Sequence, residues 1–435
     1  MLEVLKETDR ACTVTFTLSW KIWNDIAIII AWFETDDFFQ RIAILFLLTC
    51  LFGYTTNIVE AFSTTYATLI GFCLAARLYM TTYLALVAWL VPMIRLVMIY
   101  YVGFSLLNVA LWIGSIHVSY PNQLALIFMA LFLEVGGQTP YIVLLNFAHR
   151  HLPALRTWTS RAMDFHPALN IKHRVERTNA FVSLVFGYTV VAILYQSATA
   201  GIDAIFGKGI LGLIQPFAYN WLYFELDGAF LSSHAIRRAK FSAMVWSIAH
   251  LPFIMSFVLG GGAMARLVLT TDTDNTHEDM LTETYQARFE HEVSQGIRWF
   301  YCVGFGLALL FMCMVSVSHT HKDLSETRLS KRWRLCVRAS VASVMICLPL
   351  AGDDLNSLNL IGIMSALIVF TTSVEAWGVT WKGSGFIVRR NPCSYVGNCG
   401  KKDLQAAMEK DGEIDVDTLG EKSRYKQSGI ANVPM

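Results

Sequence analysis

Long apolar runs alternate with short polar segments along the whole chain. A helix needs roughly 20 mostly apolar residues to cross the ~30 Å hydrocarbon core of a bilayer. By that measure we predict an all-α, polytopic transmembrane helix bundle of about eleven spans, within a range of about nine to twelve. The predicted spans are 12–33, 40–61, 64–90, 93–116, 121–146, 178–200, 208–232, 241–262, 297–318, 333–351 and 358–379.

The two ends of the chain are polar. The first ten residues, MLEVLKETDR, precede an apolar run that contains Lys21, Asn24 and Asp25 and lacks a small-residue cleavage site, so we expect no cleavable signal. The segment 383–435 is polar and rich in lysine. We therefore predict a transmembrane domain at 1–382 and a disordered tail at 383–435.

The composition agrees with membrane insertion. Hydrophobic residues make up 55% of the chain and charged residues 15%, whereas soluble domains carry roughly 25% charged residues. The net charge of +1 provides no basic face for nucleic acid. The expected environment is the lipid bilayer, and no nucleic-acid partner is expected.

Charged loops predict an orientation. With eleven spans, one side carries clusters of Lys and Arg within 147–177, 237–240 and 319–338 and in the tail, whereas the long loop 267–296 on the other side is acidic. Excess Lys and Arg mark the cytosolic side. We predict a multi-pass protein of the endoplasmic reticulum or another endomembrane, with the basic loops and the carboxyl-terminal tail in the cytosol.

Ionisable residues inside spans are costly and are therefore candidate functional residues. They are Asp25, Glu60, Arg77, Arg95, Glu134, Glu225, Asp227, His250 and Glu375. Glu134 lies deepest and is followed by Gly136, Gly137 and Pro140, which loosen a helix. Two interpretations of Glu134 stay open, a structural ion pair and a site residue.

The segment N-W-L-Y-F-E-L-D, at 220–227, concentrates carboxyls and aromatic rings. Glu225 and Asp227 point roughly 200° apart on a helix and cannot form a carboxylate pair. Tyr223 shares a face with Asp227, and Trp221 shares one with Glu225. A carboxyl in a dry pocket has a raised pKa and can donate a proton. The alternative is that both carboxyls are solvated near Arg237 and Arg238.

A second polar group opens the sixth span. His173 and Glu176 lie on one face of the helix and Arg177 follows, but no third ligand can be placed beside them, so we predict no metal site. Glu176 suits the positive end of a helix as a capping residue. The basic residues beside it are equally suited to an anion or a lipid headgroup.

Four segments together are similar to one family. They are H-R-V-E-R-T-N-A-F-V-S-L-V-F-G (173–187), W-F-E-T-D-D-F-F-Q-R (32–41), N-W-L-Y-F-E-L-D (220–227) and A-H-L-P-F (249–253). In sequence order they resemble the segments of the low-temperature-requirement A (LtrA) membrane proteins, over roughly residues 20–380. Two departures are that Tyr188 follows Gly187 where the family commonly has an acid, and that the family's usual opening helix is missing.

The resemblance implies a function. Relatives of this kind are associated with fungal meroterpenoid pathways, in which membrane-embedded proteins cyclise a farnesyl-type chain. The first hypothesis is therefore a terpene cyclase, an isomerase that starts cyclisation of a prenylated, lipophilic small molecule by acid, without a metal or cofactor. The candidate acids are Glu134, Glu225 and Asp227; the candidate substrate-binding residues are Trp221, Tyr223, Tyr188, His173, Glu176, Arg177 and His250. The alternatives are a proton-linked transporter or channel, and a membrane protein without catalytic activity.

Overall fold

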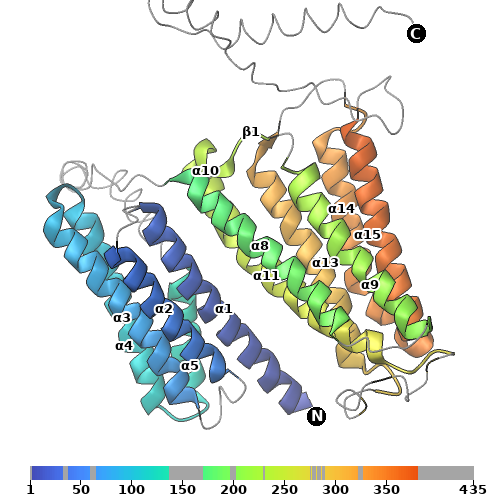
Figure 1. The fold of residues 1–435 in the computed structure, drawn as a ribbon, viewed down its shortest axis with the longest axis horizontal. Helices are drawn as coiled ribbons and strands as arrows, with labels where there is room; N and C mark the ends of the chain where they lie inside the picture. Colours follow the sequence, from blue (N-terminus) through green and yellow to red (C-terminus); the bar gives the residue numbers. More distant parts are fainter. Residues whose placement is uncertain are drawn as a thin grey trace, which may run out of the picture. The chain divides into compact units, whose positions relative to one another are not determined.

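The computed structural model (Figure 1) describes residues 2–32, 38–58, 65–136, 170–195, 202–228, 231–274, 276, 281, 286, 290–321 and 327–380. Its contacts divide the chain into two compact units. One contains 1–322 and 335–372, and the other contains 323–334 and 373–435. The first unit holds almost all of the helices.

The first five helices of this unit pack together. They are α1 (Leu2–Trp32), α2 (Phe38–Thr56), α3 (Tyr66–Leu90), α4 (Arg95–His117) and α5 (Asn122–Gly136), with a short 3₁₀ turn, η1 (Pro92–Ile94), before α4. Figure 1 draws them in blue to teal. Their shared core includes Leu47, Tyr54, Ile70 and Trp112, all nearly inaccessible. We call this group the first bundle.

The later helices form a second group. They are α8 (Ile171–Leu194), α9 (Ala204–Asn220), α10 (Ala235–Arg238), α11 (Lys240–Leu269), α13 (Gln295–Ser318), α14 (Lys331–Cys347) and α15 (Ser357–Val379), with the π-helical turn η2 (Trp221–Leu226) and the 3₁₀ turn η4 (Leu348–Asp354). Two short antiparallel strands, β1 (Leu231–Ser233) and β2 (Thr320–His321), join the ends of α9 and α13. We call the part of this group in the first unit the second bundle.

Small residues let α11 and α13 pack closely. A Cβ atom built on Gly304 would lie 2.6 Å from the backbone nitrogen of Gly260 and 2.9 Å from the carbonyl oxygen of Ser256. These are backbone atoms, which cannot rotate away as a flexible side chain can. Gly304 is therefore required where the two helices approach each other, beside Ser256 and Gly260 of α11.

The predicted fold class is confirmed. Among the described residues, nine helices are long and apolar enough to cross a membrane. The predicted spans 121–146 and 208–232 correspond to the shorter helices α5 and α9, and α9 continues into η2. The other nine predicted spans each overlap one of the nine helices.

Some predicted positions differ or are not described. The sixth helix begins at Ile171 and not at 178, because the side chain of Asn170 caps it by accepting from the His173 N–H at 3.4 Å. His173, Glu176 and Arg177 therefore lie within α8. Outside the described residues lie Glu60, Gly137, Pro140 and the predicted tail 383–435.

The close approach of α11 and α13 can be tested by enlarging Gly304. We expect Gly304→Ala to lower the free energy of unfolding by ~1–3 kcal/mol, because the added methyl group forces the two backbones apart. Thermal unfolding in detergent measures the effect. Gly262→Ala on α11 is the matched control, because a Cβ there meets nothing within 4 Å; equal effects in the two variants would contradict the packing argument.

Candidate functional site

Glu134 lies in the core of the first bundle and is 3% exposed. Nη2 of Arg77, on α3, donates to its Oε2 at 2.5 Å, and the indole N–H of Trp112, on α4, reaches Oε1 at 3.4 Å. Nη1 of Arg77 also lies 3.7 Å from Asp25 on α1, which is paired with Lys21. Two positive and two negative groups thus balance inside this bundle.

Glu134 and Arg77 form an ion pair, which is the first of the two interpretations of Glu134 left open by the sequence. Both carboxylate oxygens of Glu134 accept hydrogen bonds, as an ionised carboxylate does, whereas a proton donor needs one oxygen to carry hydrogen. Because arginine is always charged, the pair with Arg77 is neutral only when Glu134 is ionised. The role of Glu134 as a catalytic acid stays a prediction.

The N-W-L-Y-F-E-L-D segment forms a π-helical turn. The N–H of Asp227 donates to the carbonyl oxygen of Leu222 at 3.1 Å, five residues back, so one extra residue is inserted at the end of α9. Trp221 and Glu225 are exposed, whereas Tyr223 and Asp227 are half-buried, which agrees with the two faces predicted from the sequence. Turns of this kind are frequent at functional sites.

Asp227 is held by an arginine from another helix. Nη1 and Nη2 of Arg338, on α14, reach its two oxygens at 2.8 and 3.0 Å, and the hydroxyl of Ser316 on α13 donates at 3.2 Å. Arg338 is 1% exposed. The sequence counted Arg338 in the basic cluster 319–338 and also within the predicted span 333–351; in the structure it lies within α14, and its buried side chain neutralises Asp227. Asp227 therefore accepts at both oxygens, as Glu134 does.

Tyr223 and His250 meet inside the second bundle. The Tyr223 hydroxyl lies 2.8 Å from Nε2 of His250 and 3.2 Å from Oδ1 of Asn179 on α8. Nδ1 of His250 lies 2.6 Å from the carbonyl oxygen of Trp246. A carbonyl only accepts, so Nδ1 carries a hydrogen. His250 is 1% exposed, so its ring is enclosed by protein.

Further aromatic and imidazole rings continue from His250 to the end of the bundle. The Trp246 ring lies 4.5 Å from His250 and 4.9 Å from His234, and the His234 and His319 rings are 4.6 Å apart between centroids. Nδ1 of His319 accepts from the Ala235 N–H at 3.1 Å. We call Asn179, Tyr223, His234, Trp246, His250 and His319 the histidine–tyrosine cluster.

His234 lies at the amino-terminal end of α10, outside the spans. Its Nδ1 accepts from the Ile236 N–H at 3.3 Å and so caps the short helix. Burial, and secondarily the positive charge of Arg237, lower the pKa of His234 to about 4. The side chain is therefore neutral at pH 7.

The other candidate residues lie elsewhere. Tyr188 and Trp221 are 46% and 39% exposed and do not belong to the cluster. His173 lies 3.5 Å from Glu176 at the exposed start of α8, and Arg177 is half-buried on the same helix. Within the described ranges no three His, Cys, Asp or Glu side chains gather as metal ligands.

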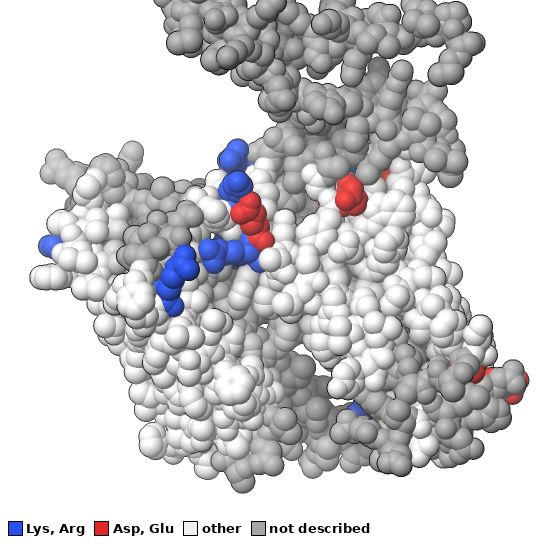
Figure 2. Space-filling view, in the orientation of Figure 1, with Lys and Arg blue, Asp and Glu red and all other residues white. Residues whose placement is uncertain are grey.

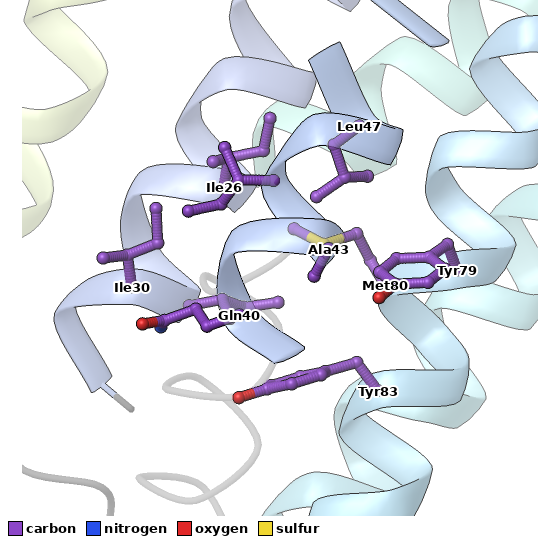
Figure 3. A pocket seen from close by; sticks show the side chains of 10 residues that line it. Ile26, Ile30, Gln40, Ala43, Leu47, Tyr79, Met80 and Tyr83 are labelled. Carbon is purple, nitrogen blue, oxygen red and sulfur yellow. The ribbon is translucent and has the colours of Figure 1, made fainter. Parts of the chain in front are cut away.

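Figure 3 shows a small apolar pocket between α1, α2 and α3. Its walls include Ile26, Ile30, Leu47, Met80 and Tyr83, and its volume is about 20 Å³. That volume holds about one water molecule. The pocket is too small for a prenylated substrate.

A match to a protein-family model shows the family of the chain. The family model described as "Bacterial low temperature requirement A protein (LtrA)" matches residues 10–374. The chain belongs to the LtrA family. The match contains all four segments that resembled the family in sequence. No curated protein and no solved structure matches the chain.

Sequence reasoning missed several members of the cluster in this LtrA protein. Asn179 stands in the family segment 173–187 but is uncharged, and Trp246 resembles any interfacial aromatic residue. His234 and His319 lie just beyond helix ends, beside basic loops. His234 and His319 share one feature in the sequence. Each lies just beyond the end of a predicted span, on the side predicted to be cytosolic.

The ion pair of Asp227 makes a prediction for this LtrA protein. Asp227→Asn leaves Arg338 buried without a counter-charge, which we expect to lower the free energy of unfolding by ~3–5 kcal/mol. Thermal unfolding in detergent measures the change. Replacing both partners, as Asp227→Leu with Arg338→Met, should recover most of the loss. The control Glu225→Gln alters an exposed carboxyl and should have little effect; a loss as large as that of Asp227→Asn would contradict the assignment.

The pKa of His234 predicts a pH dependence. The unfolded chain binds the proton near pH 6.5 and the folded chain only near pH 4, so the stability contributed by neutral His234 is complete above pH 6.5 and falls as the pH drops toward 4. We expect His234→Gln to flatten this part of a plot of unfolding temperature against pH. His117→Gln, at an exposed position on α4, should leave the curve unchanged. Superimposable wild-type and His234→Gln curves would exclude the effect.

Proposed function

We propose that this LtrA-family protein is a proton-linked transporter or channel in which His250 accepts and releases the proton. One observation carries the proposal, namely the buried His250 ring held between the Trp246 carbonyl oxygen at 2.6 Å and the Tyr223 hydroxyl at 2.8 Å. Ionisable residues at membrane depth commonly form proton relays in pumps and transporters. Histidine is the side chain that changes charge near neutral pH.

The hydrogen bonds of His250 allow two states. In the neutral ring Nδ1 carries the hydrogen, so Nε2 accepts from the Tyr223 hydroxyl. The Asn179 amide, whose Oδ1 faces Tyr223, has to turn over in this state before its NH2 group can donate to the Tyr223 oxygen. In the protonated ring Nε2 donates to Tyr223, and the Tyr223 hydroxyl then donates to Oδ1 of Asn179. The same three side chains thus satisfy both charge states without moving apart.

A proline lies inside each of the two helices that carry the pair, and a π-helical turn follows one of them. Pro216 lies inside α9, which ends in the π-helical turn, and Pro252 lies inside α11, two residues after His250. Broken or loosened helices are typical of transporter sites, because they free backbone groups and allow helix segments to move. The two prolines and the π-helical turn therefore favour transport over a rigid scaffold.

Fixed ion pairs and a protonatable cluster have different roles in this proposal. Asp227 with Arg338 stays neutral as a unit, so the charge of His250 is the one that changes. Trp246, His234 and His319 connect His250 to the end of the bundle where α10 lies. We propose that this end faces the cytosol, as the basic loops indicate, and that the membrane is the endoplasmic reticulum or another endomembrane.

A terpene cyclase is the second candidate, and one observation favours it. Aromatic rings line the interior around the π-helical turn, with Tyr223 stacked 5.8 Å from Phe253 and Phe186 lying 4.8 Å from Phe257. Such rings can stabilise carbocations formed from a prenylated, lipophilic substrate. The candidate acids support it less well, because Glu134 and Asp227 are bound by arginines and Glu225 is exposed.

Proton flux tests the proposed function. Purified protein is reconstituted into vesicles with a pH-sensitive dye inside, and a potassium gradient with valinomycin drives protons inward. Flux is measured alone and with a panel of small organic acids and phosphate outside. We expect the wild type to acidify the lumen faster than empty vesicles, His250→Gln to return to the empty-vesicle rate, and Tyr223→Phe to lie between them.

His117→Gln is the matched control, because it removes an exposed histidine of the first bundle; it should keep the wild-type flux. Equal rates for wild type, His250→Gln and empty vesicles over the whole panel would overturn the transport proposal. The same vesicles incubated with prenylated phenols test the second candidate, and a cyclised product detected by mass spectrometry would support the cyclase instead.

A further inference from the structure

Arg174 is a buried arginine on α8 with a nitrogen that has no hydrogen-bond partner. Its side chain is 5% exposed. Nη2 donates to Oδ1 of Asn24 on α1, and the guanidinium carbon lies 6.0 Å from the Trp23 ring. Nη1 is buried and meets no acceptor among the described residues. A buried donor without an acceptor indicates a missing water or ligand.

Among the described residues, the charges around Arg174 do not balance. Lys21 with Asp25 and Arg77 with Glu134 contribute two positive and two negative charges. Arg174 adds a third positive charge, and the side chain to which it donates, Asn24, is neutral. Asp25 attracts Arg174 electrostatically, but Asp25 is already paired with Lys21 and lies 3.7 Å from Arg77. A buried charge without a counter-charge is expensive, and arginine cannot become neutral by losing its proton.

The surroundings of Arg174 are suited to an anionic amphiphile. Figure 2 shows Lys and Arg side chains, with Asp and Glu side chains beside them, near the start of α8, where Lys172 lies 3.9 Å from Glu176. Next to the guanidinium, the rings of Trp20, Trp23 and Phe181 form an apolar cluster with centroids 4.5–5.3 Å apart. Arg174 can thus contact the charged head of such a molecule, and the aromatic rings can contact its apolar chain.

We propose that Arg174 binds a phosphate group between α1 and α8, carried by an anionic lipid or by free phosphate. Nη1 would donate to a phosphate oxygen while Nη2 keeps its bond to Asn24. Arginine favours phosphate because its planar fork of donors matches the oxygens. The proposal uses none of the residues of the histidine–tyrosine cluster and stands whether or not the protein moves protons.

Binding to the delipidated full chain tests the site. Native mass spectrometry of protein in a neutral detergent measures adducts with phosphatidic acid in one arm and inorganic phosphate in the other, and phosphatidylcholine serves as the zwitterionic comparison. We expect Arg174→Gln to weaken phosphate-group binding about ten- to hundredfold, the effect of losing a charge-assisted hydrogen bond. Arg174→Lys keeps the charge but loses the fork and should lie between.

Arg177→Gln is the matched control, because it removes one arginine from the same helix at a less buried position. It should keep most of the binding; a loss equal to that of Arg174→Gln would indicate a diffuse basic surface and overturn the site. A response to phosphatidic acid alone assigns the lipid source, and one to inorganic phosphate alone assigns the free ion. If neither binds the wild type more tightly than Arg174→Gln, Nη1 holds only water and the proposal is wrong.

Thermal unfolding separates binding from folding. If Arg174→Gln is misfolded, it shows no cooperative unfolding transition even in the absence of ligand. A folded variant should keep a cooperative transition that phosphatidic acid or phosphate no longer raises, whereas either source raises the wild-type temperature if it binds the folded state. An equal rise in both proteins would contradict the site.

Discussion

Charge neutralisation away from water is the constraint on which this structure depends. A charged side chain at membrane depth is stable when an opposite charge or a set of hydrogen bonds meets it. Arg77 and Glu134 join α3 to α5, and Arg338 joins α14 to the π-helical turn through Asp227. In the smaller unit Arg334 meets Glu375 at 2.7 Å. Each pair fixes which helices are neighbours and in which register, a specificity that apolar side chains provide poorly.

These fixed pairs also separate architecture from chemistry. An arginine–carboxylate pair keeps its protonation state, because each partner stabilises the charge of the other. His250 is held instead by neutral partners, the Tyr223 hydroxyl and the Trp246 carbonyl oxygen, and these tolerate either charge state. Of the intramembrane carboxyls that look most reactive in the sequence, Glu134 and Asp227 are each paired with an arginine, and their role as acids stays a prediction. The reactive candidate is the histidine beside them.

The spans could be predicted from sequence because hydrophobic length is a local property, and it placed helices under all eleven predicted runs. The partners could not, because Arg77 is 57 residues from Glu134 and Arg338 is 111 residues from Asp227. A basic residue near a span end can be either a topology signal or a buried partner, and the sequence did not show that Arg338 is buried against Asp227. The π-helical turn could not be predicted either, since its residues have no special composition; only the separation of Glu225 and Asp227 onto different faces was predicted.

The same constraint applies to Arg174, whose buried charge has no counter-charge among the described residues. If buried charges in this bundle are kept only when they are compensated, then a third positive charge beside two balanced pairs needs a counter-charge from outside the described protein. The aromatic surface of Trp20, Trp23 and Phe181 next to it offers little to a small hydrated ion, whereas it suits an acyl chain. A phosphate group carried by a lipid would meet both the unpaired donor and the apolar surface, whereas free phosphate would meet only the donor; in either case the phosphate would lie between α1 of the first bundle and α8 of the second.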